Sequence, residues 1–415
     1  MHWVRTTALV AGAGMLAGGA EAQTKQQVTG PVATYWMSAQ TQTGLGGAGG
    51  GAPSMGAMMG AMMGGGGANV SKSLTLQLGS SRKPTGEPTA EHLPPAALKA
   101  GQTLPLITPK ATTSEYSPMP KGLQPKGRML IYWGCGERAK AGQPVVIDFA
   151  KVAAGQAPPA MQAMQLTTPM QPPSLTRNAT YGEWPNRKTN TSVPGAGSLV
   201  GDHVIRGNYS PEIKFNLAAE QDFLGPLNLT KNLLNPSGSG QIAWSPLPNA
   251  RAYLATAVGG AENGTVVMWT SSEVQATSFA MSDFISNADI TRLVNLKALM
   301  APTTTTCTIP QEVIKAAPQA MVQLAAFGGE TNISYPPRPA DPKTPWNIDW
   351  TLKVRYKSLT GGMLGMDMAS MAGMADDDEA PASRGGQGQQ QPPAPALPGI
   401  GGAILKGLGA RLPGL

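Results

Sequence analysis

The chain contains, in its C-terminal half, the stretch Trp346-Asn-Ile-Asp-Trp-Thr-Leu-Lys-Val-Arg-Tyr-Lys-Ser358. Its apolar side chains occupy every second position: Ile348, Trp350, Leu352, Val354 and Tyr356. The positions between them are polar: Asn347, Asp349, Thr351, Lys353 and Arg355. A period of two is typical of a β-strand, because successive side chains point to opposite faces of a sheet. The stretch therefore predicts a strand of an antiparallel sheet that buries its apolar face and leaves its polar face in water.

Similar patterns recur along the chain, rich in β-branched and aromatic residues and separated by turn-forming residues. They span residues 32–39, 70–78, 128–133, 144–149, 202–217, 240–244, 251–258, 265–271 and 319–327. Helical patterns are confined to residues 286–296 and 309–317. Glycine (52) and proline (38) are abundant among the 415 residues, and both disfavour long helices. We predict a mainly β fold: two antiparallel sandwich-like domains with few short helices and long irregular segments.

Changes in composition divide the chain into five predicted parts. These are a signal peptide (1–22), a β domain (28–155), a Pro/Gln/Thr-rich linker (156–195), a β-sandwich (196–360) and a disordered tail (361–415). In the first domain, the strands at 32–39 and 70–78 are expected to pair around a Gly/Met-rich loop, residues 44–67. Such a loop buries too little surface to offset the entropy of ordering it. The Pro-rich residues 84–126 are expected to be extended and to stay outside the sheet.

The N-terminal residues have the parts of a secretory signal. Arg5 precedes an apolar run over residues 6–20, and Ala20-Glu21-Ala22 fits a signal-peptidase site. We therefore expect an exported protein of the periplasm, the extracellular space or the cell surface. No later stretch reaches about 20 consecutive apolar residues, so no transmembrane helix is expected. The net charge of +7 is spread thinly along the chain, so no binding to nucleic acid is expected either.

The chain has two cysteines, Cys135 and Cys307. An exported protein meets an oxidising compartment, in which an even number of cysteines favours pairing. We predict a disulfide between Cys135 and Cys307. The alternative is two separately buried thiols.

Residue patterns for common catalytic chemistry are scarce. After the predicted signal peptide the histidines are His92 and His203, and no spacing typical of a zinc or serine hydrolase occurs. The Asp202-His203 pair is interpreted as a polar couple where a loop enters a strand. Residues 44–49 have the glycine spacing of a dinucleotide-binding loop, but no helical pattern follows to receive a pyrophosphate. We predict no catalytic residue and no enzyme activity.

Methionine is concentrated in two glycine-rich segments. The first cluster is Met55, Met58, Met59, Met62 and Met63. The second cluster is Met363, Met366, Met368, Met371 and Met374. Thioethers are soft ligands that suit Cu(I), and short spacings let a loop wrap one ion. Copper binding by these residues is therefore a hypothesis, and its alternative is an adaptable low-complexity segment that binds no cofactor.

Residues 241–254 read Gln-Ile-Ala-Trp-Ser-Pro-Leu-Pro-Asn-Ala-Arg-Ala-Tyr-Leu. The strand residue Trp244 is followed by a proline-bearing turn and by Tyr253 on the next strand. This segment resembles the early strands of fibronectin type III-like β-sandwiches. The resemblance implies a sandwich architecture and a role in adhesion or scaffolding, but it implies no site. The neighbouring strands are irregularly spaced, and the helical patterns are not typical of that module.

Tryptophan outnumbers phenylalanine, with eight residues against six. The strand positions predict a core role for three of them, Trp244, Trp269 and Trp350. Four others could be exposed and stack on sugar rings: Trp36, Trp133, Trp184 and Trp346. We predict an exported, non-enzymatic structural or binding protein whose partner is an envelope protein or a polysaccharide. The alternatives are a Met-rich periplasmic copper-binding protein and a glycan-binding or glycan-active protein, and the oligomeric state stays open.

Overall fold

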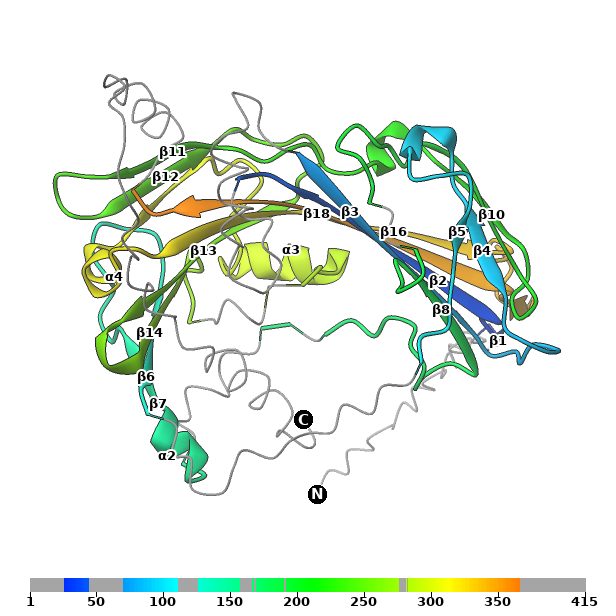
Figure 1. Cartoon of the computed structure of the whole chain (residues 1–415), viewed down its shortest axis with the longest axis horizontal. Helices are drawn as coiled ribbons and strands as arrows, with labels where there is room; N and C mark the ends of the chain where they lie inside the picture. The colour runs from blue at the N-terminus through cyan, green and yellow to red at the C-terminus, as the bar shows by residue number, and fades with distance from the viewer. Residues whose placement is uncertain are drawn as a thin grey trace, which may run out of the picture. The chain divides into compact units, whose positions relative to one another are not determined.

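The computed structural model describes residues 26–44, 70–110, 126–156, 166–167, 169–189, 192–275, 281 and 283–365. The chain divides into two units, Met1–Met371 and Ala372–Leu415, and every described residue belongs to the first unit. This unit is mainly β, as the sequence predicts (Figure 1). Its described strands form sheets of nine, four, three and two strands.

The largest sheet is mixed. Across the sheet, its strands are β7 (Val145–Asp148), β6 (Arg128–Trp133), β14 (Thr265–Thr270), β13 (Ala252–Ala261), β16 (Met321–Tyr335), β18 (Trp350–Met363), β2 (Ala33–Gln42), β3 (Ser71–Ser80) and β8 (Thr180–Trp184). The β6–β14 and β2–β18 pairs are parallel, and the other neighbours are antiparallel. At its centre, ten residues of β2 pair in unbroken register with β18, from Ala33 opposite Trp350 to Gln42 opposite Leu359.

Three smaller sheets and short helices complete the described unit. The four-stranded sheet has the order β10 (Ile213–Leu217), β9 (Gly201–Gly207), β4 (Ala90–Leu93), β5 (Leu104–Pro105). The three-stranded sheet is β11 (Leu229–Leu234), β12 (Gly240–Trp244), β15 (Thr306–Ile309), and the two-stranded sheet is β1 (Val28–Thr29) with β17 (Trp346–Asn347). The α-helices are α2 (Phe149–Ala153), α3 (Asn287–Asn295) and α4 (Gln311–Ala316), and 3-10 turns span Ala96–Leu98, Ala219–Gln221 and Glu262–Gly264. None of the helices in the described ranges has the length and apolar character needed to cross a membrane.

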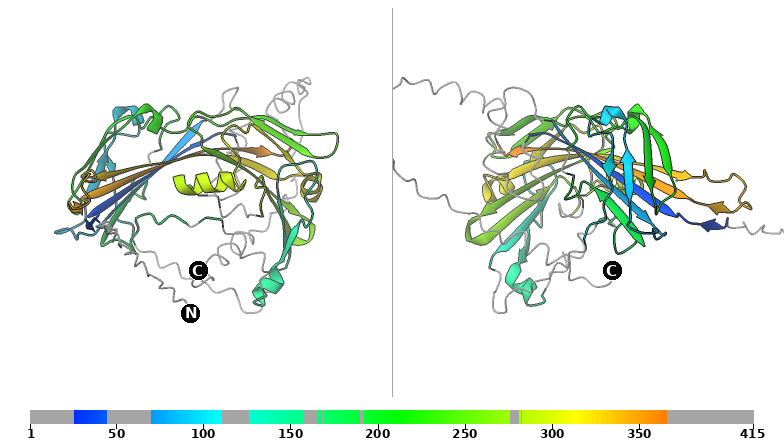
Figure 2. Two further views of the ribbon diagram at one scale, coloured as in Figure 1. Left: turned by 180° about the vertical axis from the view of Figure 1, so that it is seen from behind. Right: turned by 45° about the vertical axis from the view of Figure 1, so that its right-hand side comes forward.

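The two faces of the large sheet belong to different apolar clusters. On one face, Met37 of β2 and Val354 of β18 join the larger cluster, which also contains Ile205 of β9 and Ile242 of β12. On the other face lies the smaller cluster, to which α3 contributes Leu293. Figures 1 and 2 show α3 on one side of the large sheet and the β11–β12 hairpin on the other. The alternation seen in the sequence therefore divides the sheet into a face covered by other strands and a face covered in part by α3.

The large sheet combines strands from both ranges that were expected to form separate domains. β2, β3, β6 and β7 come from residues 28–155, and β13, β14, β16 and β18 come from residues 196–360. The parallel pairs β2–β18 and β6–β14 join the two groups. The two ranges thus contribute to one sheet. Pairing between strands so distant in sequence depends on tertiary contacts, which a local residue pattern does not contain.

Several segments expected to be irregular also contain strands. β4 and β5 fall within residues 84–126, and β8 falls within the predicted linker 156–195 and forms an edge of the large sheet. β18 extends to Met363, past the predicted start of the tail at residue 361. The strand predicted over residues 202–217 is a hairpin of β9 and β10. These strands are short or flanked by proline and glycine, which weakens their alternation signal.

Other local predictions agree with the structure. β2 and β3 form the predicted antiparallel hairpin, while residues 45–69 of its connection lie outside the described residues, as do the predicted signal peptide and residues 366–415. The segment that resembles fibronectin type III-like modules forms β12 and the start of β13, which belong to different sheets. The rings of Trp244 and Tyr253 lie 5.5 Å apart. The resemblance itself stays a prediction.

A buried chain of hydrogen bonds joins the four-stranded sheet to the large sheet. His203 of β9 approaches the Leu199 carbonyl at 2.7 Å through Nε2, which must donate because a carbonyl only accepts. Its Nδ1 therefore accepts from His92 Nε2 of β4 at 2.9 Å, and His92 Nδ1 accepts from the Tyr35 hydroxyl of β2 at 2.8 Å. Burial lowers the pKa of both histidines, and the charge of His203 lowers the pKa of His92 further. At His203, the hydrogen bond to the Leu199 carbonyl and the charge of Asp202 oppose the shift. Every donor and acceptor in this chain of hydrogen bonds therefore has a partner when both imidazole rings are neutral.

Candidate anion-binding site

Three basic side chains lie on the face of β18 that is directed toward α3. Lys353, Arg355 and Lys357 occupy alternate positions, opposite in direction to the residues of the larger core cluster. Same-face residues on a strand are about 7 Å apart, so the three charges form a row. On the neighbouring strand β2, Trp36 is in register with Lys353, and Ser38 is in register with Arg355.

Arg355 is the centre of this row and is only 6% exposed. Its Nε and Nη2 atoms donate to Ser38 Oγ at 3.1 and 2.7 Å. Its Cζ atom lies 5.0 Å from the ring centroid of Trp36 and 4.5 Å from that of Phe284, which precedes α3. Two cation–π contacts and two hydrogen bonds therefore fix the guanidinium between β2 and the start of α3.

The third guanidinium nitrogen, Nη1, differs from Nε and Nη2 in its hydrogen bonding. It is buried and has no hydrogen-bond partner in the described structure. Asp283 Oδ2 lies 3.9 Å from Nη1, which is too far for a hydrogen bond, and the Asp283 side chain is 73% exposed. Solvent screens such a pair, so it compensates the buried charge poorly. Burial lowers the pKa of Arg355, and the charges of Asp283 and Glu330 oppose that shift.

The two lysines of the row have different surroundings. Lys357 is 5% exposed, and its Nζ atom lies 4.7 Å from the Phe284 ring centroid. Burial lowers the pKa of Lys357 to about 8; Asp283 opposes this shift and Arg355 adds to it. Lys353 donates to Glu330 Oε2 at 2.6 Å and lies over Trp36. Two ion pairs to the row are found among the described residues: Glu330 with Lys353, and the longer contact of Asp283 with Arg355.

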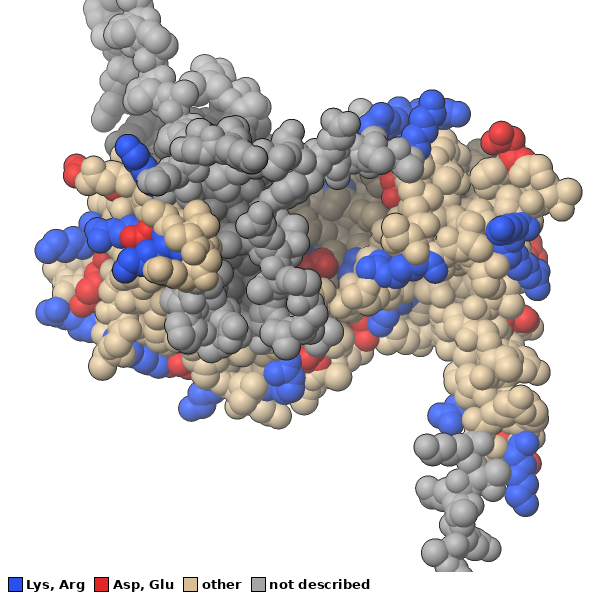
Figure 3. Space-filling view, turned by 90° about the horizontal axis from the view of Figure 1, so that it is seen from below, with Lys and Arg blue, Asp and Glu red and all other residues tan. Residues whose placement is uncertain are grey.

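This arrangement is suited to holding an anion. Arg355 Nη1 offers N–H groups with no acceptor, and Ser38 Oγ, which accepts from Arg355, keeps its own hydroxyl proton for donation. Charge-assisted hydrogen bonds to a guanidinium are strong, and a partly desolvated setting strengthens them. Figure 3 looks onto the α3 side of the sheet and shows a hollow in the described surface with basic and acidic side chains along it. The arrangement presents positive charge and hydrogen-bond donors, the groups that a negatively charged ligand requires.

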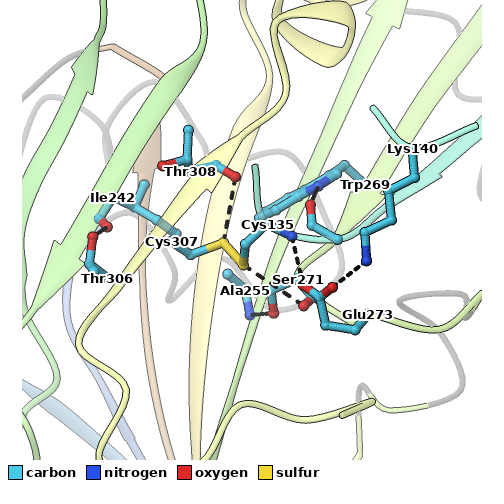
Figure 4. Close-up of a disulfide and its surroundings, with 11 residues drawn as sticks. Cys135, Lys140, Ile242, Ala255, Trp269, Ser271, Glu273, Thr306, Cys307 and Thr308 are labelled. Carbon is cyan, nitrogen blue, oxygen red and sulfur yellow. Dashed lines mark hydrogen bonds and ion pairs between the residues drawn. A yellow bond between two sulfur atoms is a disulfide. The ribbon is translucent and has the colours of Figure 1, made fainter. Parts of the chain in front are cut away.

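The predicted disulfide is confirmed. Cys135 and Cys307 are joined by an S–S bond of 2.06 Å. Figure 4 shows that Glu273 receives the Cys135 backbone N–H and pairs with Lys140, while Trp269 Nε1 donates to the Gly134 carbonyl at 2.9 Å. The bond connects the segment after β6 in the large sheet to β15 in the three-stranded sheet, so its role is structural.

Most of the proposed copper ligands lie outside the described residues. This holds for Met55, Met58, Met59, Met62, Met63, Met366, Met368, Met371 and Met374. Met363 is the last residue of β18, and its carbonyl accepts from Asn232 Nδ2 at 2.6 Å. In the described part of the chain, no group of three or more His, Cys, Asp or Glu side chains is placed to hold a metal ion.

Most of the tryptophans considered above are buried, and Asp202 and His203 bind different partners. The three predicted core tryptophans, Trp244, Trp269 and Trp350, are buried, and so are Trp36 and Trp184. Of the residues considered for sugar stacking, Trp133 and Trp346 are half-buried. His203 belongs to the buried hydrogen-bond chain, whereas the exposed Asp202 accepts from Asn216 Nδ2 at 2.8 Å.

Lys353 and Arg355 lie on the strand face that the sequence pattern predicts to contact water, and that pattern does not mark them as functional residues. The structure buries Arg355 and Lys357 beside Trp36 and Phe284. The available signal was three basic residues at alternate positions of one predicted strand. Like charges so placed repel each other, and this repulsion needs a compensating partner.

No protein-family model, no curated protein and no solved structure was found to match the chain.

Proposed function

We propose that the protein is an exported, non-enzymatic binding protein that holds an anionic group of its partner at Arg355. The observation that carries this proposal is the buried Nη1 atom, which lacks a hydrogen-bond acceptor in a row of three cations. A buried charged donor without an acceptor is costly, so a bound anion gains both the Coulomb attraction and the missing hydrogen bond. An envelope protein or an acidic polysaccharide could supply such a group.

Two features support the exported location within this proposal. The Cys135–Cys307 disulfide is compatible with an oxidising compartment. The N-terminal residues also carry the pattern of a secretory signal. Mass spectrometry of the protein isolated from its native host tests the location: export predicts an N-terminus at Gln23.

Replacing Arg355 by glutamine is expected to weaken anion binding at least tenfold, because hydrogen bonds to a charged group contribute about 1.5–3 kcal/mol. The measurement is the thermal unfolding midpoint in sodium benzoate, phosphate or sulfate, with sodium chloride matching the ionic strength. A bound anion stabilises the native state, so at least one of the three should raise the wild-type midpoint by a few degrees. Arg355→Gln should lose that increase.

Arg338→Gln is the matched control. Arg338 also lies over a tryptophan, with its Cζ atom 5.6 Å from the Trp346 ring centroid, but it is a surface residue. This variant should keep the anion-dependent increase. If Arg355→Gln fails to fold, Lys357→Gln serves as the second variant. An increase that is equal in Arg355→Gln and Arg338→Gln, or none in the wild type, contradicts the proposal.

We also propose Cu(I) binding by the two methionine clusters as a second candidate function. One observation favours it: β2 and β18, the strands that lead into the two clusters in the sequence, are parallel neighbours and run toward the same end of the sheet. Thr43 N donates to the Leu359 carbonyl at 2.9 Å, and β2 and β18 run parallel up to this point. Gly44 and Gly365, the last described residues before the segments that hold most of these methionines, therefore both follow strands that run toward the same end of the sheet.

Replacing the methionines of both clusters by leucine is expected to abolish Cu(I) binding, because leucine preserves size and apolar character but supplies no thioether. The measurement is a Cu(I) titration in competition with a chromogenic chelator. Variants with one altered cluster serve as controls and should bind more weakly than the wild type. Equal binding by the wild type and the fully substituted variant would rule the copper function out.

A further inference from the structure

We infer that the anionic group is a carboxylate and that it takes the place of the Asp283 side chain beside Arg355. This inference rests on the proposed function and narrows it to one chemical class. The Asp283 Oδ2 atom shows where a ligand oxygen would lie, because it is close to Arg355 Nη1 but, at 3.9 Å, beyond hydrogen-bond distance. A ligand carboxylate that approaches more closely supplies the acceptor that Asp283 does not.

The hydrogen bonds of Arg355 leave one edge of the guanidinium for a ligand. Nε and one N–H of Nη2 are directed to Ser38 Oγ. The remaining edge is formed by Nη1 and the second N–H of Nη2. Two parallel N–H groups on such an edge match the two oxygens of a carboxylate in a bidentate pair.

The aromatic neighbours restrict the direction of approach. The Trp36 and Phe284 ring centroids lie 5.0 and 4.5 Å from Cζ, so two aromatic rings occupy space directly beside the guanidinium. With Nε and one N–H of Nη2 bound to Ser38, approach within the guanidinium plane gives a ligand the most direct access to the remaining edge. A planar carboxylate fits this direction, whereas the oxygens of a tetrahedral phosphate or sulfate also extend above and below the plane, toward the rings.

Displacing Asp283 costs little. Its side chain is 73% exposed, and its ion pair with Arg355 is held at a distance longer than a hydrogen bond. Turning this carboxylate to solvent therefore breaks no hydrogen bond to Arg355. The carboxylate of Asp283 can therefore turn to solvent and leave the Nη1 edge to the ligand, whose apolar part then lies near the Phe284 and Trp36 rings. Benzoate, a flat carboxylate with an aromatic body, is the simplest probe.

The inference predicts that Asp283→Asn raises the affinity for benzoate about three- to fivefold, because the competing carboxylate is removed. Isothermal titration of the full chain with benzoate and with inorganic phosphate provides the measurement. Asp289→Asn is the matched control, since Asp289 belongs to α3, pairs with Arg292 instead of Arg355 and gives the same change in net charge. It should leave the benzoate affinity unchanged.

The outcomes separate this inference from the proposed function. The inference holds if the wild type prefers benzoate to phosphate and Asp283→Asn binds benzoate more tightly. It is overturned, while anion binding at Arg355 stands, if phosphate binds better than benzoate or if Asp283→Asn weakens benzoate binding. If neither the wild type nor any variant binds benzoate or phosphate, the proposed function itself fails.

Discussion

Replacing Cys135 and Cys307 together by serine is expected to lower the free energy of unfolding by about 5 kcal/mol. The disulfide closes a loop between residues 172 apart in sequence, and closing so long a loop removes much conformational entropy from the unfolded chain. It also connects the segment after β6 to β15, so its loss removes the covalent link between the three-stranded sheet and the large sheet. Urea denaturation followed by tryptophan fluorescence measures the change.

The wild type treated with a strong thiol reductant is the control for this experiment. Its unfolding midpoint should approach that of the double serine variant, because both lack the covalent link. A Cys135→Ala/Cys307→Ala variant should lose as much stability as the double serine variant. This agreement would show that the loss comes from the missing covalent link and not from the polar serine side chains. A loss below about 1 kcal/mol in the double variants would show that the disulfide does not restrict the unfolded chain as supposed.

Replacing His92 by leucine is expected to lower the free energy of unfolding by about 4 kcal/mol. The change removes the acceptor of the Tyr35 hydroxyl and the donor to His203 Nδ1, which leaves two buried polar atoms without partners. Each unsatisfied group costs about 1–3 kcal/mol. Tyr35→Phe leaves only His92 Nδ1 unsatisfied and should cost about half as much in the same urea experiment. Equal losses of unfolding free energy in His92→Leu and Tyr35→Phe would contradict a continuous chain of hydrogen bonds from Tyr35 through His92 to His203.

The same hydrogen-bond chain predicts acid sensitivity. Burial lowers the pKa of His92 and His203, so the unfolded chain binds more protons than the folded chain once the pH falls below about 6.5. Stability is therefore fully present above that pH and is lost as the pH falls toward the folded-state pKa values. In His92→Leu, with one titrating histidine fewer, stability should fall less steeply between pH 6.5 and about 5. An equal slope in both proteins would contradict the assignment of neutral rings.

The local pattern predicted individual strands well and their pairing poorly. β6 (Arg128–Trp133) and β12 (Gly240–Trp244) coincide with their predicted ranges, because each has clear strand-forming residues between turns. The contact of β2 with β18 joins Ser38 to Arg355 across 317 residues of sequence. Such a pairing is decided by the packing of whole elements, and alternation within one strand holds no information about its neighbour.

The same limit explains why the candidate site was missed. The alternation of residues 346–358 correctly separates Val354 from Arg355, but it assigns the polar face to water. Arg355 is buried because Trp36 of β2 and Phe284 before α3 approach it, and both contacts are tertiary. The disulfide, by contrast, was predictable because the chain has two cysteines, which allow one intramolecular pair, and the predicted export favours their oxidation.

The central claim is that Arg355 binds a carboxylate at the edge now approached by Asp283. A crystal structure of the protein grown with sodium benzoate tests it most directly. We expect a benzoate oxygen within about 3.2 Å of Arg355 Nη1, with the Asp283 side chain turned to solvent. Benzoate found only elsewhere, with Asp283 still beside Arg355, would contradict the account.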